Sequence, residues 1–379
     1  MAMKLLILST GTICAALSFL HVAGIAIAIA RARKSAAGHC VPEDSAGISI
    51  IRPVCGVENF AEEALGSSFR LAYPRHEILF CVAQPNDPVV PLVRRLMAAH
   101  PQTPARLLIG NERISANPKL NNIVKGWAAA QYDWIVMADS NVLMRRDMLE
   151  RLMAAWRRDT GLVCSPPVGC LPDGLWAELE CAFLNTYQAR WQLMADAVGI
   201  GFAQGKTMLW RRDILEAAGG IRALAAEMAE DAAATKLVRG SGLRVRLVDA
   251  PFAQPLGWRS AAEVWQRQVR WARLRRDTFR LFFIPEILTG GLVPLVACLV
   301  CAMAADGPAT IIAAAFAAAW YGCEALLAHT AGWHLSYRSP FVWVLRDALL
   351  PVVWLAGWRG KDFVWRGTVM RIAHRSSSA

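Results

Sequence analysis

One segment near the start of the chain limits how it can fold more than any other feature. Residues 5–30 form an apolar run without Asp, Glu, Lys or Arg, and about 20 such residues are enough for a helix to span a bilayer. Arg31, Arg33 and Lys34 follow the run, whereas only Lys4 precedes it. A cleaved signal peptide carries its charge in front. We therefore predict a transmembrane anchor at residues 1–31, with its N-terminus outside and the following residues in the cytosol.

The chain becomes apolar again over residues 281–358. The ranges 287–303 and 309–331 are candidate spans, and the second contains Glu324, which would be costly to bury without a partner. Residues 341–358 carry Arg346-Asp347 near their middle, which suits an interfacial or re-entrant helix. Two crossings would return the chain to the cytosol, where the positive-inside rule places the basic tail at 359–379.

The formal net charge of +11 at pH 7 fits nucleic acid, anionic lipid or a phosphorylated substrate as a partner. Proteins that bind nucleic acid usually spread basic residues over one binding face. Here they gather beside the apolar ends, at 31–34, 267–280 and 359–375, where they would meet the anionic cytoplasmic leaflet. This distribution favours a membrane and argues against nucleic acid. The ten cysteines follow no framework, as expected of a reduced cytosolic domain.

Between the apolar ends, residues 40–280 are typical of a soluble domain, because short apolar runs alternate with helix-length segments. Asp87-Pro88 and Asn117-Pro118 each place a capping residue before a proline, which predicts two helix starts. The alternation predicts a doubly wound α/β fold with a mainly parallel sheet. Buried strands are expected at 48–53, 77–83, 106–109, 134–138 and 161–164.

In such a fold, ligands bind beyond the carboxyl ends of the strands. Asp139 directly follows the strand expected at 134–138. It could bind a ligand there or cap the next turn, and the spacing does not separate these interpretations. Its single carboxylate could hold Mg²⁺ together with a diphosphate. Asp87 also follows a strand, but its place before a proline favours a helix cap.

Two further polar stretches open expected helices. In Glu230-Asp231, one carboxylate could deprotonate a hydroxyl nucleophile, although acidic residues at a helix N-terminus are also common for structural reasons. The stretch at 117–122 contains Lys119 and Asn121. Such polar helix starts bind anions, and they are also frequent on protein surfaces.

A capping box, Ser260 with Glu263, predicts the start of a strongly basic helix. On this helix Arg267, Arg270 and Trp271 are spaced so that they share one face. Two cations and an indole suit a phosphorylated ligand that carries a ring. A helix lying on the membrane explains the same pattern.

These motifs, in this order, resemble the ceramide glucosyltransferase family of membrane glycosyltransferases. The stretch FAQGKTMLWRRD at 202–213 is also similar to the family sequence before the third aspartate. The resemblance covers residues 45–285, the N-terminal anchor and the C-terminal apolar region. The matching motifs are FCVAQPNDP around Asp87, NPKLNN at 117–122, MADSN around Asp139, AEDAAATK around Asp231 and RQVRW at 267–271.

The resemblance implies a GT-A fold and inverting transfer of a hexose, most simply glucose, from a UDP-sugar. The acceptor would be the hydroxyl of a membrane lipid, either ceramide or diacylglycerol. The protein would be an integral membrane protein of a bacterial inner membrane, with its catalytic domain in the cytosol.

The resemblance also implies roles for individual residues. Asp87 would help bind the nucleotide. Lys119 and Asn121, in the polar helix start, are expected to bind the substrate or its nucleotide. Asp139 would bind the sugar diphosphate and a divalent cation, Mg²⁺ or Mn²⁺. Asp231 would be the general base. The diphosphate or the acceptor would be contacted by Arg267, Arg270 and Trp271.

Two positions depart from related patterns, and two alternative functions stay open. Arg267 stands where processive polysaccharide synthases usually carry Gln, which favours a lipid acceptor. Asn141 replaces the second carboxylate of a DxD motif, which weakens the case for a metal.

The alternative functions are a hopanoid glycosyltransferase that uses UDP-N-acetylglucosamine, and a non-catalytic membrane protein that binds anionic lipid.

Overall fold

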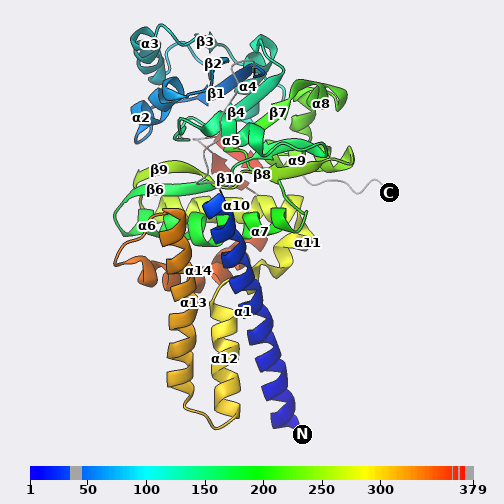
Figure 1. The fold of residues 1–379 in the computed structure, drawn as a ribbon, viewed down its shortest axis with the longest axis vertical. Helices are drawn as coiled ribbons and strands as arrows, with labels where there is room; N and C mark the ends of the chain where they lie inside the picture. Colours follow the sequence, from blue (N-terminus) through cyan, green and yellow to red (C-terminus); the bar gives the residue numbers. More distant parts are fainter. Residues whose placement is uncertain (35–44, 361, 366–367, 372–379) are drawn as a thin grey trace. The chain divides into compact units, whose positions relative to one another are not determined.

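The computed structural model describes residues 1–34, 45–360, 362–365 and 368–371. The chain divides into two compact units (Figure 1). The first, which we call the sheet unit, comprises residues 30–172 and 191–258. The second, the helical unit, comprises residues 1–29, 173–190 and 259–379. The range expected as one soluble domain, 40–280, therefore contributes to both units.

A seven-stranded, mainly parallel sheet forms the centre of the sheet unit. Its strands are β1 (Ile48–Val54), β2 (His76–Val82), β3 (Ala105–Ile109), β4 (Trp134–Ala138), β5 (Thr160–Cys164), β7 (Thr207–Arg211) and β8 (Arg244–Leu247). Their order is β3-β2-β1-β4-β7-β5-β8, and β7 runs antiparallel to β4 and β5. The other neighbouring pairs are parallel. The five strands expected from the sequence are confirmed, as is the mainly parallel sheet.

Helices pack on this sheet, and their closeness explains why its central strands are largely apolar. Every residue of β1 is buried, as in parallel sheets that are covered on both faces. Gly126 lets α4 approach the sheet, because a Cβ there would lie 2.7 Å from Ile51 Cγ2. The helical segments are α2 (Ala61–Gly66), η1 (Ser67–Arg70), α3 (Val89–Ala99), α4 (Pro118–Ala129), α5 (Met148–Ala154), α7 (Arg190–Ala197), α8 (Arg212–Ala217), η3 (Ile221–Ala226) and α9 (Glu230–Gly240). A separate two-stranded sheet pairs β6 (Pro167–Asp173) with β9 (Phe252–Trp258).

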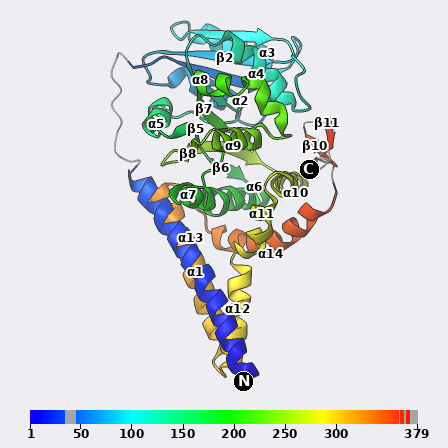
Figure 2. The same cartoon turned by 90° about the vertical axis from the view of Figure 1, so that its right-hand side faces the viewer.

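The helical unit contains α1 (Ala2–Lys34), α6 (Leu175–Ala182), the π-helix η2 (Phe183–Ala189), α10 (Ala261–Thr278), α11 (Arg280–Phe283), η4 (Ile284–Leu288), α12 (Leu292–Ala304), α13 (Ala309–Ala331) and α14 (Ser339–Trp358). Within this unit α1, α12 and α13 run side by side (Figures 1 and 2). The His21 ring of α1 stacks on Trp320 of α13 at 3.7 Å. Figure 2 shows α14 lying across the direction of these three helices. A hairpin, β10 (Asp362–Trp365) with β11 (Thr368–Arg371), follows.

Within the described residues, α1, α13 and α14 are each long and apolar enough to span a membrane. The expected span at 287–303 is interrupted, because η4 ends at Leu288 and α12 begins at Leu292. The segments Arg280–Leu288 and Leu292–Ala304 meet at a bend of 45° and together could form a fourth, broken span. Two glycines occupy the bend. A Cβ at Gly291 would lie 2.7 Å from Asp347 Oδ2, so a larger residue would not fit there.

Candidate active site

Three residues of the candidate site follow parallel strands where these end at one edge of the sheet. Asp139 directly follows β4, while Gly56 and Asp87 come after β1 and β2. Asp87 Oδ1 accepts hydrogen bonds from Gly56 N at 2.8 Å and from Val89 N at 2.9 Å. The N-cap of α3 is Pro88, one residue later than the sequence predicts, so Asp87 accepts its hydrogen bond just before the helix. The same carboxylate ties the ends of two strands together. A shallow pocket beside them includes Gly56, Glu58, Asn59, Val89, Ser140 and Asn141 in its lining.

A buried arginine fixes the turn that carries Asp139. Arg52 lies in the middle of β1 and is fully buried. Its guanidinium donates to the backbone oxygens of Asp139, Ser140 and Val142 at 2.9, 3.0 and 3.0 Å. Burial lowers the pKa of Arg52 to about 9, although Asp139 opposes this shift. The guanidinium therefore stays charged at neutral pH and holds the turn after β4.

Lys119, in the first turn of α4, joins the aspartate of one strand end to the start of α9. Its ammonium lies 2.6 Å from Asp139 Oδ1 and 2.6 Å from Glu230 Oε1. It also donates to the backbone oxygen of Gly205 at 2.5 Å. Asn117 caps α4, as expected, and donates to Glu230 Oε2 at 2.6 Å. The predicted site residues Asp139 and Lys119 are thus in direct contact.

The dipeptide Gly205-Lys206, just before β7, contacts both Asp139 and Asp231. Gly205 N donates to Asp231 Oδ2 at 3.1 Å. The Lys206 ammonium lies 3.0 Å from Asp139 Oδ2. A Cβ at Gly205 would come within 2.8 Å of Glu230 Oε1, so a larger residue would displace the Glu230 carboxylate. Asp139, Lys119 and Asp231 therefore belong to one cluster.

The two aspartates of the cluster differ in their affinity for protons. Burial alone would raise the pKa of Asp139, but Lys119 and Lys206 outweigh it and lower that pKa to about 2. For Asp231, burial and the negative charge of Glu230 raise the pKa to about 6, and Lys119 opposes the rise. Pairs of carboxyls whose pKa values are pushed apart are typical of acid–base sites. Asp139 stays ionised here, whereas Asp231 can exchange a proton close to neutral pH.

The oxygens of Asp139 and Asn141 converge on one cation position. In the structure the Lys206 ammonium fills it, 3.0 Å from Asp139 Oδ2 and 3.0 Å from Asn141 Oδ1. Carboxylate and amide oxygens are suitable ligands for Mg²⁺. The described residues contain no group of three or more His, Cys, Asp or Glu that could hold a metal ion. The site therefore fits a divalent cation when a diphosphate supplies further ligands and Lys206 moves away.

Asn121, predicted to bind the nucleotide, supports the loop before α4. Its Oδ1 accepts hydrogen bonds from Ile114 N and Ser115 N, both at 2.9 Å. Its Nδ2 donates to the backbone oxygen of Ser115 at 3.0 Å. The side chain thereby shapes the approach to the helix that carries Lys119. Nucleotide binding by Asn121 and Asp87 stays a prediction.

The RQVRW motif lies on α10, in the helical unit, and the capping box at Ser260 is confirmed. Arg267 forms an ion pair with Glu180 of α6, which is fully buried. Gln268 is buried and accepts a hydrogen bond from Gln188 at 3.0 Å. These contacts anchor the motif within its own unit. The roles predicted for Arg267, Arg270 and Trp271 in binding diphosphate or acceptor stay predictions.

Other arginines of this basic segment also have partners inside the helical unit. Arg275 forms two contacts with Glu286, at 2.6 and 2.9 Å. Arg276 donates to the backbone oxygen of Gly357 at 2.9 Å. Arg280 stands over the Trp358 ring at 5.3 Å. One diphosphate would need fewer arginines than this segment contains. Contacts inside the helical unit explain the additional ones.

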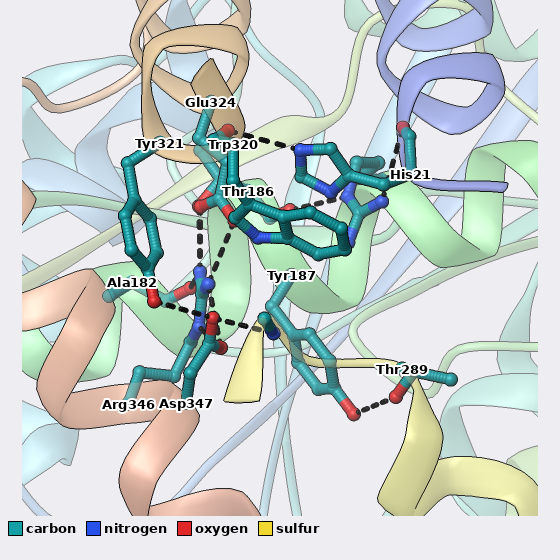
Figure 3. Close-up of polar contacts among 12 residues, drawn as sticks. His21, Ala182, Thr186, Tyr187, Thr289, Trp320, Tyr321, Glu324, Arg346 and Asp347 are labelled. Carbon is teal, nitrogen blue, oxygen red and sulfur yellow. Dashed lines mark hydrogen bonds and ion pairs between the residues drawn. The ribbon is translucent and has the colours of Figure 1, made fainter. Parts of the chain in front are cut away.

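A second polar cluster is buried in the helical unit (Figure 3). Arg346 of α14 pairs with Glu324 of α13 through two contacts, at 2.9 and 2.8 Å. Asp347 Oδ2 accepts from Gly291 N at 2.8 Å and from the Tyr321 hydroxyl at 3.1 Å. Glu324, Arg346 and Asp347 are each at most 2% exposed. The partner that Glu324 was expected to need is confirmed, and the charged pair of α14 is accommodated by protein groups.

Four residues of the sheet-unit cluster had no assigned role from sequence: Arg52, Gly205, Lys206 and Glu230. Arg52 carries a recognisable signal, since an arginine inside a wholly buried strand must find several acceptors. Gly205 and Lys206 lie within the stretch at 202–213 that resembles the family. Glu230 was weighed only as a neighbour of Asp231, and nothing in the spacing indicates its contact with Lys119.

The fold, with its cluster at the strand ends, places the protein in the class of GT-A glycosyltransferases. Among solved structures, the fold is similar to a mannosyltransferase from Pyrobaculum calidifontis in complex with GDP-Man and Mn²⁺. That likeness has a TM-score of 0.50 and 20% sequence identity, and it covers 92% of this chain and 97% of that chain.

The chain belongs to glycosyl transferase family 21, whose family model matches residues 16–377. It is 27% identical over 357 residues to ceramide glucosyltransferase 3 of Caenorhabditis elegans, covering 88% of this chain and 75% of that protein. It is 24% identical over 434 residues to the ceramide glucosyltransferase of Komagataella phaffii, covering 88% and 83%. The predicted family and GT-A fold are confirmed, and the chain is a sugar-transferring enzyme.

Proposed function

We propose that the chain transfers a hexose, most simply glucose, from a UDP-sugar to the hydroxyl of a membrane lipid, ceramide or diacylglycerol. The relatives named ceramide glucosyltransferase support this choice of sugar and acceptor. The observation that carries the proposal is the contrast between Asp139, with a pKa lowered to about 2, and Asp231, with a pKa raised to about 6. One carboxylate stays charged to bind the donor, and the other can accept a proton.

In the proposed reaction, Asp231 accepts the proton of the lipid hydroxyl as that oxygen forms a bond to C1 of the sugar. The bond between C1 and the diphosphate oxygen breaks, and UDP leaves with the bonding electrons on the face opposite the attack. Gly205 N fixes the orientation of the Asp231 carboxylate through its 3.1 Å hydrogen bond. Inversion at C1 follows from this single displacement.

The donor diphosphate would bind beside Asp139, where Lys119 and Lys206 supply positive charge. Cations aimed at the leaving group stabilise the charge that develops on it. A divalent cation held with the diphosphate by Asp139 and Asn141 would supply further stabilisation of that charge. The mannosyltransferase that shares the fold was solved with Mn²⁺, which supports a divalent cation at this place.

The replacement Asp231→Asn tests the base directly, because it removes the proton acceptor and keeps the shape of the side chain. We expect turnover of UDP-glucose with lipid to fall at least about 100-fold, while UDP binding is kept. Asp213→Asn is the matched control, since that carboxylate is 63% exposed and pairs with Arg211. Turnover by Asp231→Asn equal to that of the control would remove Asp231 from this role.

A further inference from the structure

Lys206 has a position that its sequence context does not explain. Its backbone oxygen accepts a hydrogen bond from Asp139 N at 3.0 Å. Its ammonium lies 3.0 Å from Asp139 Oδ2 and 3.0 Å from Asn141 Oδ1. Both residues of the Asp-x-Asn motif therefore direct an oxygen at the same positive charge.

The two lysines of the cluster are held differently. Lys119 is 12% exposed and lies at 2.6 Å from both Asp139 and Glu230, so its removal would leave a buried carboxylate without a cation. Lys206 is 21% exposed, and its contacts with Asp139 and Asn141 are longer. A lysine ammonium is a compact charge on a flexible stem. Of the two, Lys206 can move to a new anion at the smaller cost.

We propose that Lys206 is the resident cation of the donor site. In the nucleotide-free protein its ammonium holds Asp139 and Asn141, and a divalent cation must displace it to reach the same two oxygens. When a nucleoside diphosphate binds, the ammonium turns to the diphosphate and frees the position. This second step rests on the proposed function, whereas the competition between Lys206 and a divalent cation does not.

The charge balance of the cluster predicts how the affinity for Mn²⁺ changes when Lys206 is replaced. Without nucleotide, Asp139, Glu230 and Asp231 face Lys119 and Lys206, so loss of one lysine makes the cluster more negative by one charge. A divalent cation responds to such a change twice as strongly as a monovalent one. Lys206→Met should therefore bind Mn²⁺ more tightly than the wild type. Lys236→Met is the matched control, since Lys236 lies on α9 and pairs with Glu227 instead, at 2.8 Å.

The experiment uses the full chain in detergent and titrates Mn²⁺ without nucleotide, with free Mn²⁺ followed by its paramagnetic resonance signal. We expect Lys206→Met to bind Mn²⁺ at least tenfold more tightly than both the wild type and Lys236→Met. Equal affinities in the three proteins, or no Mn²⁺ binding by Lys206→Met, would overturn the proposal. Thermal unfolding of each variant verifies that it is folded.

A second titration measures UDP binding in EDTA and then in Mn²⁺. We expect the wild type to bind UDP in EDTA, and Lys206→Met to bind it at least tenfold more weakly there but to recover in Mn²⁺. Unchanged UDP binding by Lys206→Met in EDTA would overturn the contact with the diphosphate. A wild type that binds no UDP under either condition would contradict the proposed function, and the Mn²⁺ titration would still decide the competition.

Discussion

Single charges around Asp231 set the pH at which this enzyme should work. Burial and Glu230 raise the pKa of Asp231 to about 6, while Lys119 opposes the rise. A general base accepts a proton only in its ionised form. The carboxyl is protonated below its pKa, so we expect kcat/KM to fall as the pH drops through about 6 and to level off above it.

Two replacements should shift the pH at which kcat/KM falls, in opposite directions. We call this fall at low pH the acid limb. Glu230→Gln removes a like charge, so the pKa of Asp231 falls and the limb shifts to lower pH. Lys119→Met removes an opposite charge, so the pKa rises and the limb shifts to higher pH. Profiles of kcat/KM against pH measure both shifts. A limb that stays in place in both variants would show that another group titrates.

At the scale of residues, the sequence predicts which side chains lie at the ends of strands. It does not predict the hydrogen bonds and ion pairs that join them. Asp139 is predictable because it directly follows an apolar strand, and Asp231 because the family resemblance selects it. Lys206 is not predictable, since its contact with Asp139 depends on β7 running antiparallel beside β4. Contacts between segments far apart in sequence depend on the pairing of strands, which local patterns do not contain.

At the scale of elements, the pair Glu324–Arg346 joins α13 to α14. Breaking a buried ion pair leaves one charge without its partner, which costs about 3–5 kcal/mol. We therefore expect Glu324→Gln to lower the thermal unfolding temperature in detergent. His329→Gln is the control, because His329 lies on the same helix and is exposed. Equal unfolding temperatures for both variants would contradict a stabilising role for the pair.

Elements with strong local signals are predicted well from the sequence. The strand at 134–138, the cap at Asn117 and the capping box at Ser260 all occur as expected. The break between η4 and α12 is not predicted, because an apolar run gives no sign that Asp347 will accept a hydrogen bond from Gly291 N. The π-helix η2 is likewise not predicted, because π-helices are rare.

At the scale of the whole molecule, the distribution of basic residues predicts which side of the membrane each end occupies. The charges after α1 and in the tail predict that both flanks lie in the cytosol and that the N-terminus lies outside. We expect an epitope tag before Met1 to bind antibody on intact spheroplasts, and a tag after Ala379 to bind only after the inner membrane is permeabilised. Tags that are accessible on the same side would contradict this orientation.

The central claim is transfer of a hexose from a UDP-sugar to a membrane lipid. The most direct measurement incubates membranes containing the wild type or Asp231→Asn with labelled UDP-glucose, UDP-galactose or UDP-N-acetylglucosamine, and identifies the labelled lipid by mass. We predict a glucosylated ceramide or diacylglycerol in wild-type membranes and its absence with Asp231→Asn. An N-acetylglucosamine-bearing hopanoid would support the alternative acceptor and donor. No lipid product that depends on Asp231, from any of the three donors, would contradict the account.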